Sequence, residues 1–283
     1  MNKKQLKRLK KLAKQKQQQD SEDYIVELKH YAQLFDGIPQ IKLLINNVLE
    51  SDRLIQQGLL PQPLPKLLLP DNSQDLVYQK LQKKYPAHDK RGDQLWDQYN
   101  QALPKLDRLL RNYRDYLEDR YGMWSYVNAG YIKALSEYLA GAPVLEIMAG
   151  NGYISAGLAN LNPGQQIWTT DSKGWTKENQ TGRHPVTDVE KLDALAAINK
   201  YGKQARYVIM SWSPDKLTID MDVLQLIRQQ FPDLQLLVIG EKDGATNSPA
   251  FWQNAKLSQK GLEKVNQELQ SFDLIDEQAY LAH

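Results

Sequence analysis

From residue 143 onward the chain alternates short β-rich runs with helical stretches, and this alternation constrains the fold more than any other feature. The β-rich runs read PVLEIM, QIWTTDS, RYVIMSWS and LQLLVIGE. Strands that alternate with helices in this way form a mostly parallel sheet with helices on both faces. The sequence therefore predicts a doubly wound, Rossmann-like α/β domain over residues 121–283.

Residues 21–120 show helical periodicity instead. Apolar side chains recur at intervals of three and four after Ser21, which is expected to cap the first helix. A second helix is expected to follow Pro39, and a third to begin near Ser73. Residues 59–72 contain four prolines, which a helix does not tolerate, so this segment is expected to be an extended connector.

A long helical pattern runs from about Gly92 to Arg120. Pro104 lies inside it, and a proline in a helix interior removes a backbone donor and clashes with the preceding turn. We therefore expect a kink or a split at Pro104. The change of pattern near residue 120 predicts an all-α region before the α/β domain, and we expect it to cover the mouth of the active site or to help bind the substrate.

The first 20 residues form a basic tail on an otherwise mildly acidic chain. They hold eight Lys or Arg and one acid, whereas the rest of the chain holds 28 basic and 33 acidic side chains. A basic amphipathic segment can contact RNA, DNA or anionic lipid, although a charge run at a terminus is commonly just a solvated tail. Both interpretations stay open, and deletion of residues 1–20 distinguishes them.

Composition excludes several classes of site. The absence of cysteine rules out disulfides, thiolate nucleophiles and thiolate zinc sites. The four histidines lack the spacing of metal ligands, so no metal site is expected. No segment approaches the roughly 20 apolar residues of a membrane-spanning helix, and the first residues lack the apolar run of a secretory signal. A cytoplasmic location is expected.

The turn after the first β-rich run carries the main ligand signal. AGNG at 149–152 links that run to a helix expected to begin near Tyr153. Glycines let a ligand approach the backbone closely, and a helix N-terminus offers free amide donors. The second run ends at Asp171, where a carboxylate can accept both hydroxyls of a ribose. These features predict a nucleoside-containing cofactor.

The glycine spacing and one acid distinguish among such cofactors. A dinucleotide fingerprint that starts at Gly150 requires glycine at the position of Ser155. Glu146, inside the first strand, would face a pyrophosphate with like charge. S-adenosylmethionine has a cationic centre and an amino group, and both suit Glu146 better. A nicotinamide-dependent oxidoreductase is therefore a less favoured alternative.

EIMAGNGY resembles the first motif of class I S-adenosylmethionine-dependent methyltransferases, an acid followed by G-x-G-x-G. The likeness extends to a group of methyltransferase-like proteins in three further segments, RYGMWSYVNAGYIKAL, MSWSP and IGEKDGATNSPAFW, and covers about residues 118–255. It implies a Rossmann-like methyltransferase domain that binds S-adenosylmethionine. The methyl acceptor is not implied, since a fold does not fix a substrate.

The resemblance also assigns cofactor-binding positions. Glu146, Gly150 and Gly152 would line the methionine and ribose part, and Asp171 would bind the ribose hydroxyls. Asp193, after a short third strand, would lie near the adenine. It could equally be only the N-cap of the helix that follows.

The acceptor side rests on four residues. Ser211 and Trp212 follow the fourth strand, beside the expected position of the methyl group, and Trp124 could cover the methionine end of the cofactor. Trp212 could instead simply roof the pocket, and Trp124 could instead belong to the core. Glu241, at the end of the fifth strand, is the candidate base for a protonated acceptor, or else a solvated turn acid.

Two departures from the family pattern matter. Met148 stands where the first glycine of the motif normally lies; a positive φ there would cost of order 1 kcal/mol, and otherwise the side chain would narrow the pocket. At the C-terminus, SFDLIDEQAYLAH is expected to form a sixth strand, with no room for the final strand of the usual hairpin. The alternative functions are therefore a cofactor-binding module without turnover and a nucleic-acid-binding module on the same fold.

Overall fold

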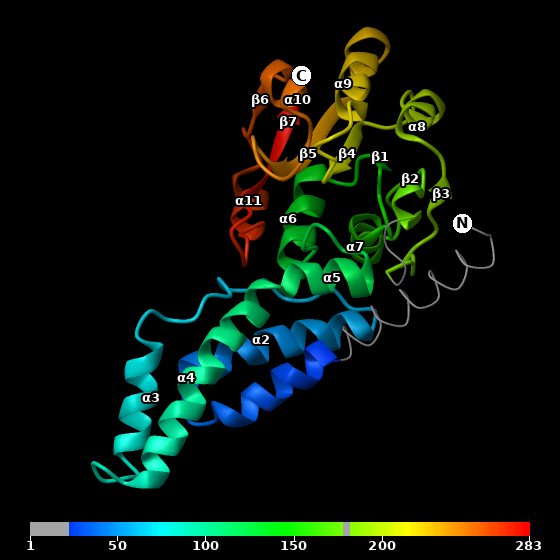
Figure 1. Cartoon of the computed structure of the whole chain (residues 1–283). Helices are drawn as coiled ribbons and strands as arrows, with labels where there is room; N and C mark the ends of the chain where they lie inside the picture. The colour runs from blue at the N-terminus through cyan, green and yellow to red at the C-terminus, as the bar shows by residue number, and fades with distance from the viewer. Residues whose placement is uncertain (1–22, 178–181) are drawn as a thin grey trace, which may run out of the picture.

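The computed structural model describes residues 23–177 and 182–283 of the chain (Figure 1). The basic tail and the proposed helix cap Ser21 lie outside the described residues, so what the sequence predicts for them stays a prediction. The described chain forms a helical region from its first part and an α/β region from the remainder.

The helical region begins with a helix over residues 23–34. The second helix, α2 (Pro39–Gln56), starts with its proline at the first helical position, where the missing N–H costs nothing. The third helix, α3 (Ser73–Gln82), starts at the expected serine. Residues 59–70, which join α2 to α3, carry neither helix nor strand.

A split of the helix at Pro104, one of the two expected outcomes, is wrong, while a kink there stays a prediction. Helix α4 (Lys90–Arg111) continues through this proline, and the chain breaks instead at Asn112, before α5 (Tyr113–Tyr121). Because α4 has a strongly amphipathic pattern, burial of its apolar face outweighs the backbone bond that one proline removes. The α4 residues that are buried are Tyr99, Ala102, Leu103, Leu106 and Leu110.

The α/β region is built on a seven-stranded sheet of order β3-β2-β1-β4-β5-β7-β6. The first five strands are parallel, and β7 runs antiparallel between β5 and β6. The predicted doubly wound α/β fold is thereby confirmed. The strands are β1 (Val144–Ile147), β2 (Ile167–Asp171), β3 (Glu190–Lys191), β4 (Tyr207–Ser211), β5 (Gln235–Glu241), β6 (Leu257–Ser258) and β7 (Glu277–Ala282).

The expectation that the final strand is missing is also wrong. The C-terminal segment expected as a sixth strand is β7, which pairs with β5 from Leu236 opposite Ala282 to Glu241 opposite Glu277. The sixth strand is the two-residue β6, which is too short to show a period in the sequence. The sheet therefore ends in a complete antiparallel hairpin.

Helices cover both faces of the sheet (Figure 1). Successive strand residues point to opposite faces, so Leu145 and Val208 pack against one helical layer while Val144 and Ile209 pack against the other. The first layer comprises α8 (Ala194–Tyr201), α9 (Ile219–Gln230) and α10 (Pro249–Asn254); the second comprises α6 (Ala129–Leu139), α7 (Tyr153–Leu161) and α11 (Glu263–Glu268).

The helical region is attached where the parallel strands end. Arg114 of α5 pairs with Asp273, just before β7, and Phe272 is part of the same apolar cluster as the buried residues of α2, α4 and α5. From this junction α3 and α4 extend away from the sheet (Figure 1). The α/β region and the helical region therefore meet at the carboxyl ends of the parallel strands, where ligands bind in this class of fold.

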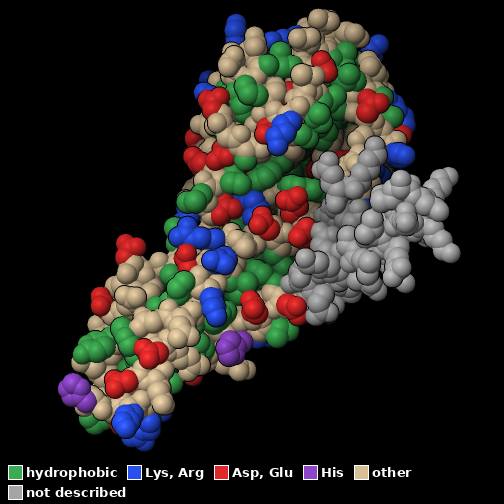
Figure 2. All heavy atoms as spheres, viewed as in Figure 1, with side chains coloured by type: hydrophobic (Ala, Val, Ile, Leu, Met, Phe, Trp, Pro, Cys, Tyr) green, Lys and Arg blue, Asp and Glu red, His purple; other side chains and the backbone are tan. Residues whose placement is uncertain are grey.

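The visible surface of the helical region carries both signs of charge. Lys and Arg side chains lie among Asp and Glu side chains on the face shown in Figure 2. Across residues 23–177 and 182–283, no helix combines the length and hydropathy needed to cross a bilayer.

Candidate functional site

The strand order reverses between β1 and β4, which lie side by side at the centre of the sheet. In doubly wound sheets, ligands bind in the crevice outside the carboxyl ends of the strands at this reversal. The glycine turn follows β1, and the Ser211–Trp212 pair closes β4. The two segments that the sequence assigns to cofactor and acceptor therefore flank one switch point.

Met148, directly before the glycine turn, has a φ of 52°, and within the turn Gly150 has a φ of 57° and Gly152 one of 81°. A Cβ atom on Gly152 would lie 2.6 Å from Cγ2 of Thr187, so both space and conformation require glycine there. A Cβ atom on Gly150 would lie 3.7 Å from the ring of Trp124, an ordinary contact. At Gly150 the requirement is therefore conformational.

Of the two alternatives raised for Met148, a positive φ or a side chain that narrows the pocket, the structure has the positive φ. The left-handed backbone of Met148 costs of order 1 kcal/mol for a residue with a side chain. Its side chain packs against the core cluster of the α8 and α9 layer, which contributes compensating apolar burial. The turn thus keeps the conformation expected of a glycine at this position.

Glu146 lies beneath the turn with an exposure of only 2%. Its Oε2 accepts a hydrogen bond of 3.0 Å from the amide of Ser155 and a second bond from the Ser155 hydroxyl. Burial raises the pKa of Glu146 to about 7; the Ser155 bonds oppose this rise, and the nearby Asp171 charge adds to it. In the sequence, Ser155 matters only because a dinucleotide motif would need glycine at its position. In the structure, Ser155 holds the Glu146 carboxylate against the first turn of α7.

Asp171 connects the end of β2 to the turn after β1. The Gly150 amide donates to Oδ2 of Asp171 over 2.9 Å, and the Lys173 amide donates to Oδ1. Burial raises the pKa of Asp171, and the bonds from Gly150 and Lys173 oppose that rise. The structure thus brings four of the proposed cofactor residues together, namely Glu146, Gly150, Gly152 and Asp171.

Two indole rings lie beside this group. The ring of Trp124 meets that of Trp175 edge-on, with centroids 5.1 Å apart, and it also lies next to Gly150. Trp124 belongs to the segment between α5 and α6, so this connection folds against the glycine turn. A covering role for Trp124 over the cofactor stays a prediction.

Asp193 occupies the N-cap of α8. Its exposed side chain accepts a hydrogen bond of 2.9 Å from the Ala196 amide. This is the capping alternative considered from the sequence. A contact between Asp193 and adenine stays a prediction.

Trp212, directly after β4, has a left-handed conformation, with φ of 53°. Its indole N–H donates to the carboxylate of Glu277, at the start of β7, and the Arg114 guanidinium lies 4.7 Å from its ring centroid. Sequence reasoning missed Arg114 and Glu277, because nothing local marks a residue that contacts the site from a distant segment.

Glu241 is the last residue of β5, directly before a turn. Its Oε2 accepts from the Ala245 amide over 2.7 Å, and its Oε1 accepts from the Asp276 amide over 3.0 Å. These bonds favour the turn-acid alternative. The role of Glu241 as a catalytic base stays a prediction.

Several buried polar atoms have no hydrogen-bond partner in the described parts of the chain. Asn151 Oδ1, in the glycine turn, and Ser211 Oγ, at the end of β4, are two of them. Buried polar atoms in folded proteins are nearly always paired, so unpaired ones at the ends of β1 and β4 fit a bound polar ligand. By contrast, the described residues contain no group of three or more His, Asp or Glu placed to hold a metal ion.

No protein-family model and no curated protein matches this chain. Among solved structures it is similar to the mitomycin 7-O-methyltransferase, at 12% identity over 77% of this chain and 74% of that chain, with a TM-score of 0.30. It is similar to a plantazolicin methyltransferase in complex with SAH, at 12% identity over 70% and 74% with a TM-score of 0.28. It is also similar to the N,N-8-amino-8-demethyl-D-riboflavin dimethyltransferase of Streptomyces davawensis, at 13% identity over 82% and 65% with a TM-score of 0.29.

Proposed function

We propose that this protein is an S-adenosylmethionine-dependent methyltransferase. The observation that carries the proposal is the position of the glycine turn, which follows β1 at the switch point with Glu146 beneath it and Asp171 beside it. The antiparallel hairpin at the end of the sheet agrees with the fold implied by the sequence resemblance.

Charge supports this cofactor over a dinucleotide. Glu146 and Asp171 are both buried, and the charge of Asp171 adds to the raised pKa of Glu146. A pyrophosphate would add negative charge to this pair, whereas a sulfonium or an ammonium group would relieve its repulsion. A cationic nucleoside is therefore the ligand that the site favours.

Named residues would hold the cofactor. A carboxylate has about four lone-pair positions, so Asp171 can accept ribose hydroxyls in addition to its two amide bonds. Glu146 would lie beneath the amino-acid part and neutralise its charge. Asn151 Oδ1, which is buried without a partner among the described residues, adds an acceptor in the turn itself.

Bound S-adenosylmethionine would supply an activated methyl group on its sulfonium. The contribution of the chain is then mainly positioning, because in-line displacement needs a nucleophile held about 3 Å from the methyl carbon. Ser211 and Trp212 lie at the neighbouring strand end, where an acceptor would enter. The buried hydroxyl of Ser211 offers a hydrogen bond to orient it.

Calorimetric titration with S-adenosylmethionine and S-adenosylhomocysteine tests the proposal, with NAD as the comparison ligand. We expect saturable binding of the first two ligands and none of NAD. No heat and no thermal stabilisation with either adenosyl ligand would overturn the assignment.

Transfer of a labelled methyl group to candidate acceptors follows once binding is established. RNA is the first candidate because of the positive charge of residues 1–20, and a chain without these residues is the control. Equal labelling of RNA by both chains would show that the tail is not an anchor.

A further inference from the structure

Hydrogen bonds join the helical region to the glycine turn through Tyr121, the last residue of α5. The Tyr121 hydroxyl donates to Oδ1 of Asp52 on α2 over 2.5 Å. Its backbone carbonyl accepts 2.7 Å from Nδ2 of Asn151 and 3.1 Å from the hydroxyl of Tyr153. One residue thus contacts α2, the glycine turn and the first turn of α7.

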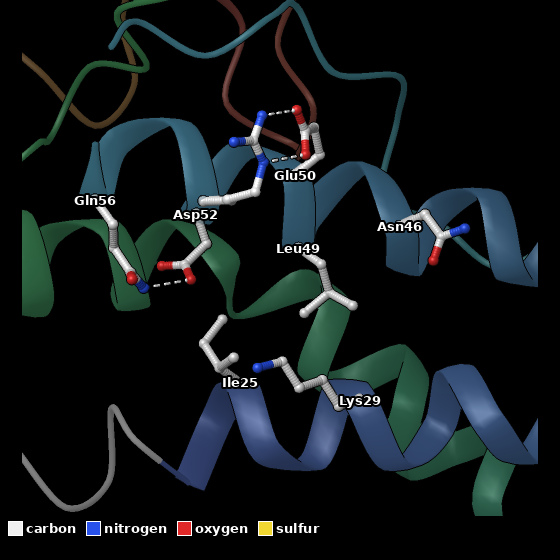
Figure 3. A pocket seen from close by; sticks show the side chains of 8 residues that line it. Ile25, Lys29, Asn46, Leu49, Glu50, Asp52 and Gln56 are labelled. Atoms are coloured by element: carbon white, nitrogen blue, oxygen red, sulfur yellow. Dashed lines mark hydrogen bonds and ion pairs between the residues drawn. The ribbon is translucent and has the colours of Figure 1, made fainter. Parts of the chain in front are cut away.

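The Asp52 end of this connection is fixed. Asp52 is 4% exposed, and it also accepts from the Tyr116 hydroxyl over 2.6 Å and from Nε2 of Gln56 over 2.7 Å. Figure 3 shows Asp52 and Gln56 on α2, at the wall of a groove of about 500 Å³ between α2 and the helix over residues 23–34. A carboxylate with this many partners holds the Tyr121 ring in one orientation.

The Asn151 end is fixed as well. Asn151 is 1% exposed, and its Nδ2 donates to the carbonyl of Gly182 over 2.8 Å in addition to that of Tyr121. Only the NH₂ group of an asparagine side chain can donate, so two carbonyls determine which way the amide faces. The acceptor Oδ1 is therefore the atom left for a ligand.

Gly122 allows this junction to form. It has a φ of 61°, and a Cβ atom on it would lie 2.3 Å from the Gly182 oxygen and 2.7 Å from Asn151 Nδ2. A side chain at this position would force Asn151 and the segment of Gly182 to move.

We propose that Asp52 and Tyr121 are positioning residues of the cofactor site, which set the placement of Asn151, and with it the glycine turn, from within the helical region. The identity of the ligand rests on the proposed function; the connection itself rests only on the contacts above. On this view the helical region is part of the cofactor site and more than a cover over the acceptor.

Two glycine variants test the connection. Gly122→Ala introduces the clash with Asn151, whereas Gly58→Ala is a matched control: Gly58 also follows a helix, has a φ of 73°, and a Cβ atom on it would have no neighbour within 4 Å. We expect Gly122→Ala to weaken S-adenosylhomocysteine binding by about five- to tenfold and to speed hydrogen exchange at the amides of the glycine turn. Gly58→Ala should change neither, although both variants place an alanine at a positive φ.

A second pair tests the Asp52 end. Tyr121→Phe and Tyr116→Phe each remove one hydroxyl bond to the same Asp52 oxygen, but only Tyr121 continues to Asn151. We expect Tyr121→Phe to weaken binding about threefold and Tyr116→Phe to leave it unchanged.

The outcomes separate this inference from the proposed function. If the wild-type chain binds neither adenosyl ligand, the proposed function fails, and hydrogen exchange of the glycine turn in the two glycine variants still decides the connection. If exchange in Gly122→Ala matches that in Gly58→Ala, the connection is overturned whatever the ligand.

Discussion

The backbone amide of Gly150 donates a hydrogen bond of 2.9 Å to Oδ2 of Asp171. These two residues, assigned to one cofactor from separate sequence motifs, therefore contact each other at the ends of the neighbouring strands β1 and β2. The bond gives Asp171 two roles, as a ligand for ribose hydroxyls and as a support for the turn that receives the rest of the cofactor.

Replacement of Asp171 by Asn should impair both roles. An amide side chain has a single acceptor oxygen, so it cannot serve both the Gly150 and the Lys173 amides. We expect a loss of about 1–3 kcal/mol in the free energy of unfolding, from one unsatisfied amide. We also expect at least a tenfold (about 1.4 kcal/mol) loss in affinity for S-adenosylhomocysteine by calorimetry.

The exposed Asp188 provides the control, since Asp188→Asn removes one negative charge, as Asp171→Asn does, but from the surface. It should alter neither stability nor affinity. Full affinity in Asp171→Asn and in Asp171→Ala would remove the ribose assignment.

The strands and the glycine turn could be predicted because their signals are local. An apolar run ended by an acid and two glycines specifies a strand, a turn and a helix start within about 20 residues, the length of one βα unit. Glu146, Gly150 and Asp171 all belong to such signals. The two-residue β6 and the helix break at Asn112 have no comparable local pattern. Both depend on packing against other segments of the same chain.

Contacts between distant segments could not be predicted. Arg114 and Glu277 flank Trp212 from the helical region and from the last strand, and no spacing in the sequence relates them. Ser155 shows a different failure. In the sequence its serine only disfavours a dinucleotide, while its bonds to Glu146 depend on the fold of α7.

Glu146 should make stability depend on pH. Burial raises its pKa from 4.5 to about 7, so the folded state holds the proton more tightly than the unfolded state does. This contribution is fully present below about pH 4.5 and is lost as pH rises through about 7, with an upper limit of about 3 kcal/mol. Glu146→Gln should gain stability relative to wild type over that range, as measured by urea unfolding at a series of pH values.

Cofactor binding should change the protonation of Glu146. A cationic ligand favours ionised Glu146, so binding near neutral pH should release a proton. The measured enthalpy would then depend on the ionisation enthalpy of the buffer, and Glu146→Gln should abolish that dependence. A buffer-independent enthalpy in the wild-type chain would place the ligand's charge away from Glu146.

Ser155→Ala should destabilise the fold. It removes the hydroxyl that donates to Glu146 and leaves only the amide bond of 3.0 Å. We expect a loss of about 1–2 kcal/mol at neutral pH, and a smaller loss in acid, where Glu146 is protonated in both states. The double variant Ser155→Ala/Glu146→Gln is the control, because a loss that persists unchanged in the Gln background would not depend on the Glu146 charge.

Replacement of Arg114 by lysine should destabilise the contact between the helical region and the sheet. Arg114 is 7% exposed, donates to Asp273 with two nitrogens, and stacks 4.7 Å from the Trp212 ring centroid and 4.9 Å from that of Phe272. Lysine keeps the charge but loses the planar fork and the stacking, so Arg114→Lys should cost about 2 kcal/mol or more.

An arginine-to-lysine change at an exposed ion pair is the control for the buried contacts of Arg114. Arg111 pairs with Asp107 on the surface of α4, and Arg111→Lys should cost no more than about 0.5 kcal/mol. Because the Arg114 guanidinium and the Glu277 carboxylate both contact Trp212, Arg114→Lys should also shift the fluorescence of the folded protein, with Trp212→Phe identifying the part of the signal that comes from this indole. Equal costs for the two lysine variants, with no such shift, would mean that the guanidinium does not hold Trp212 at the end of β4.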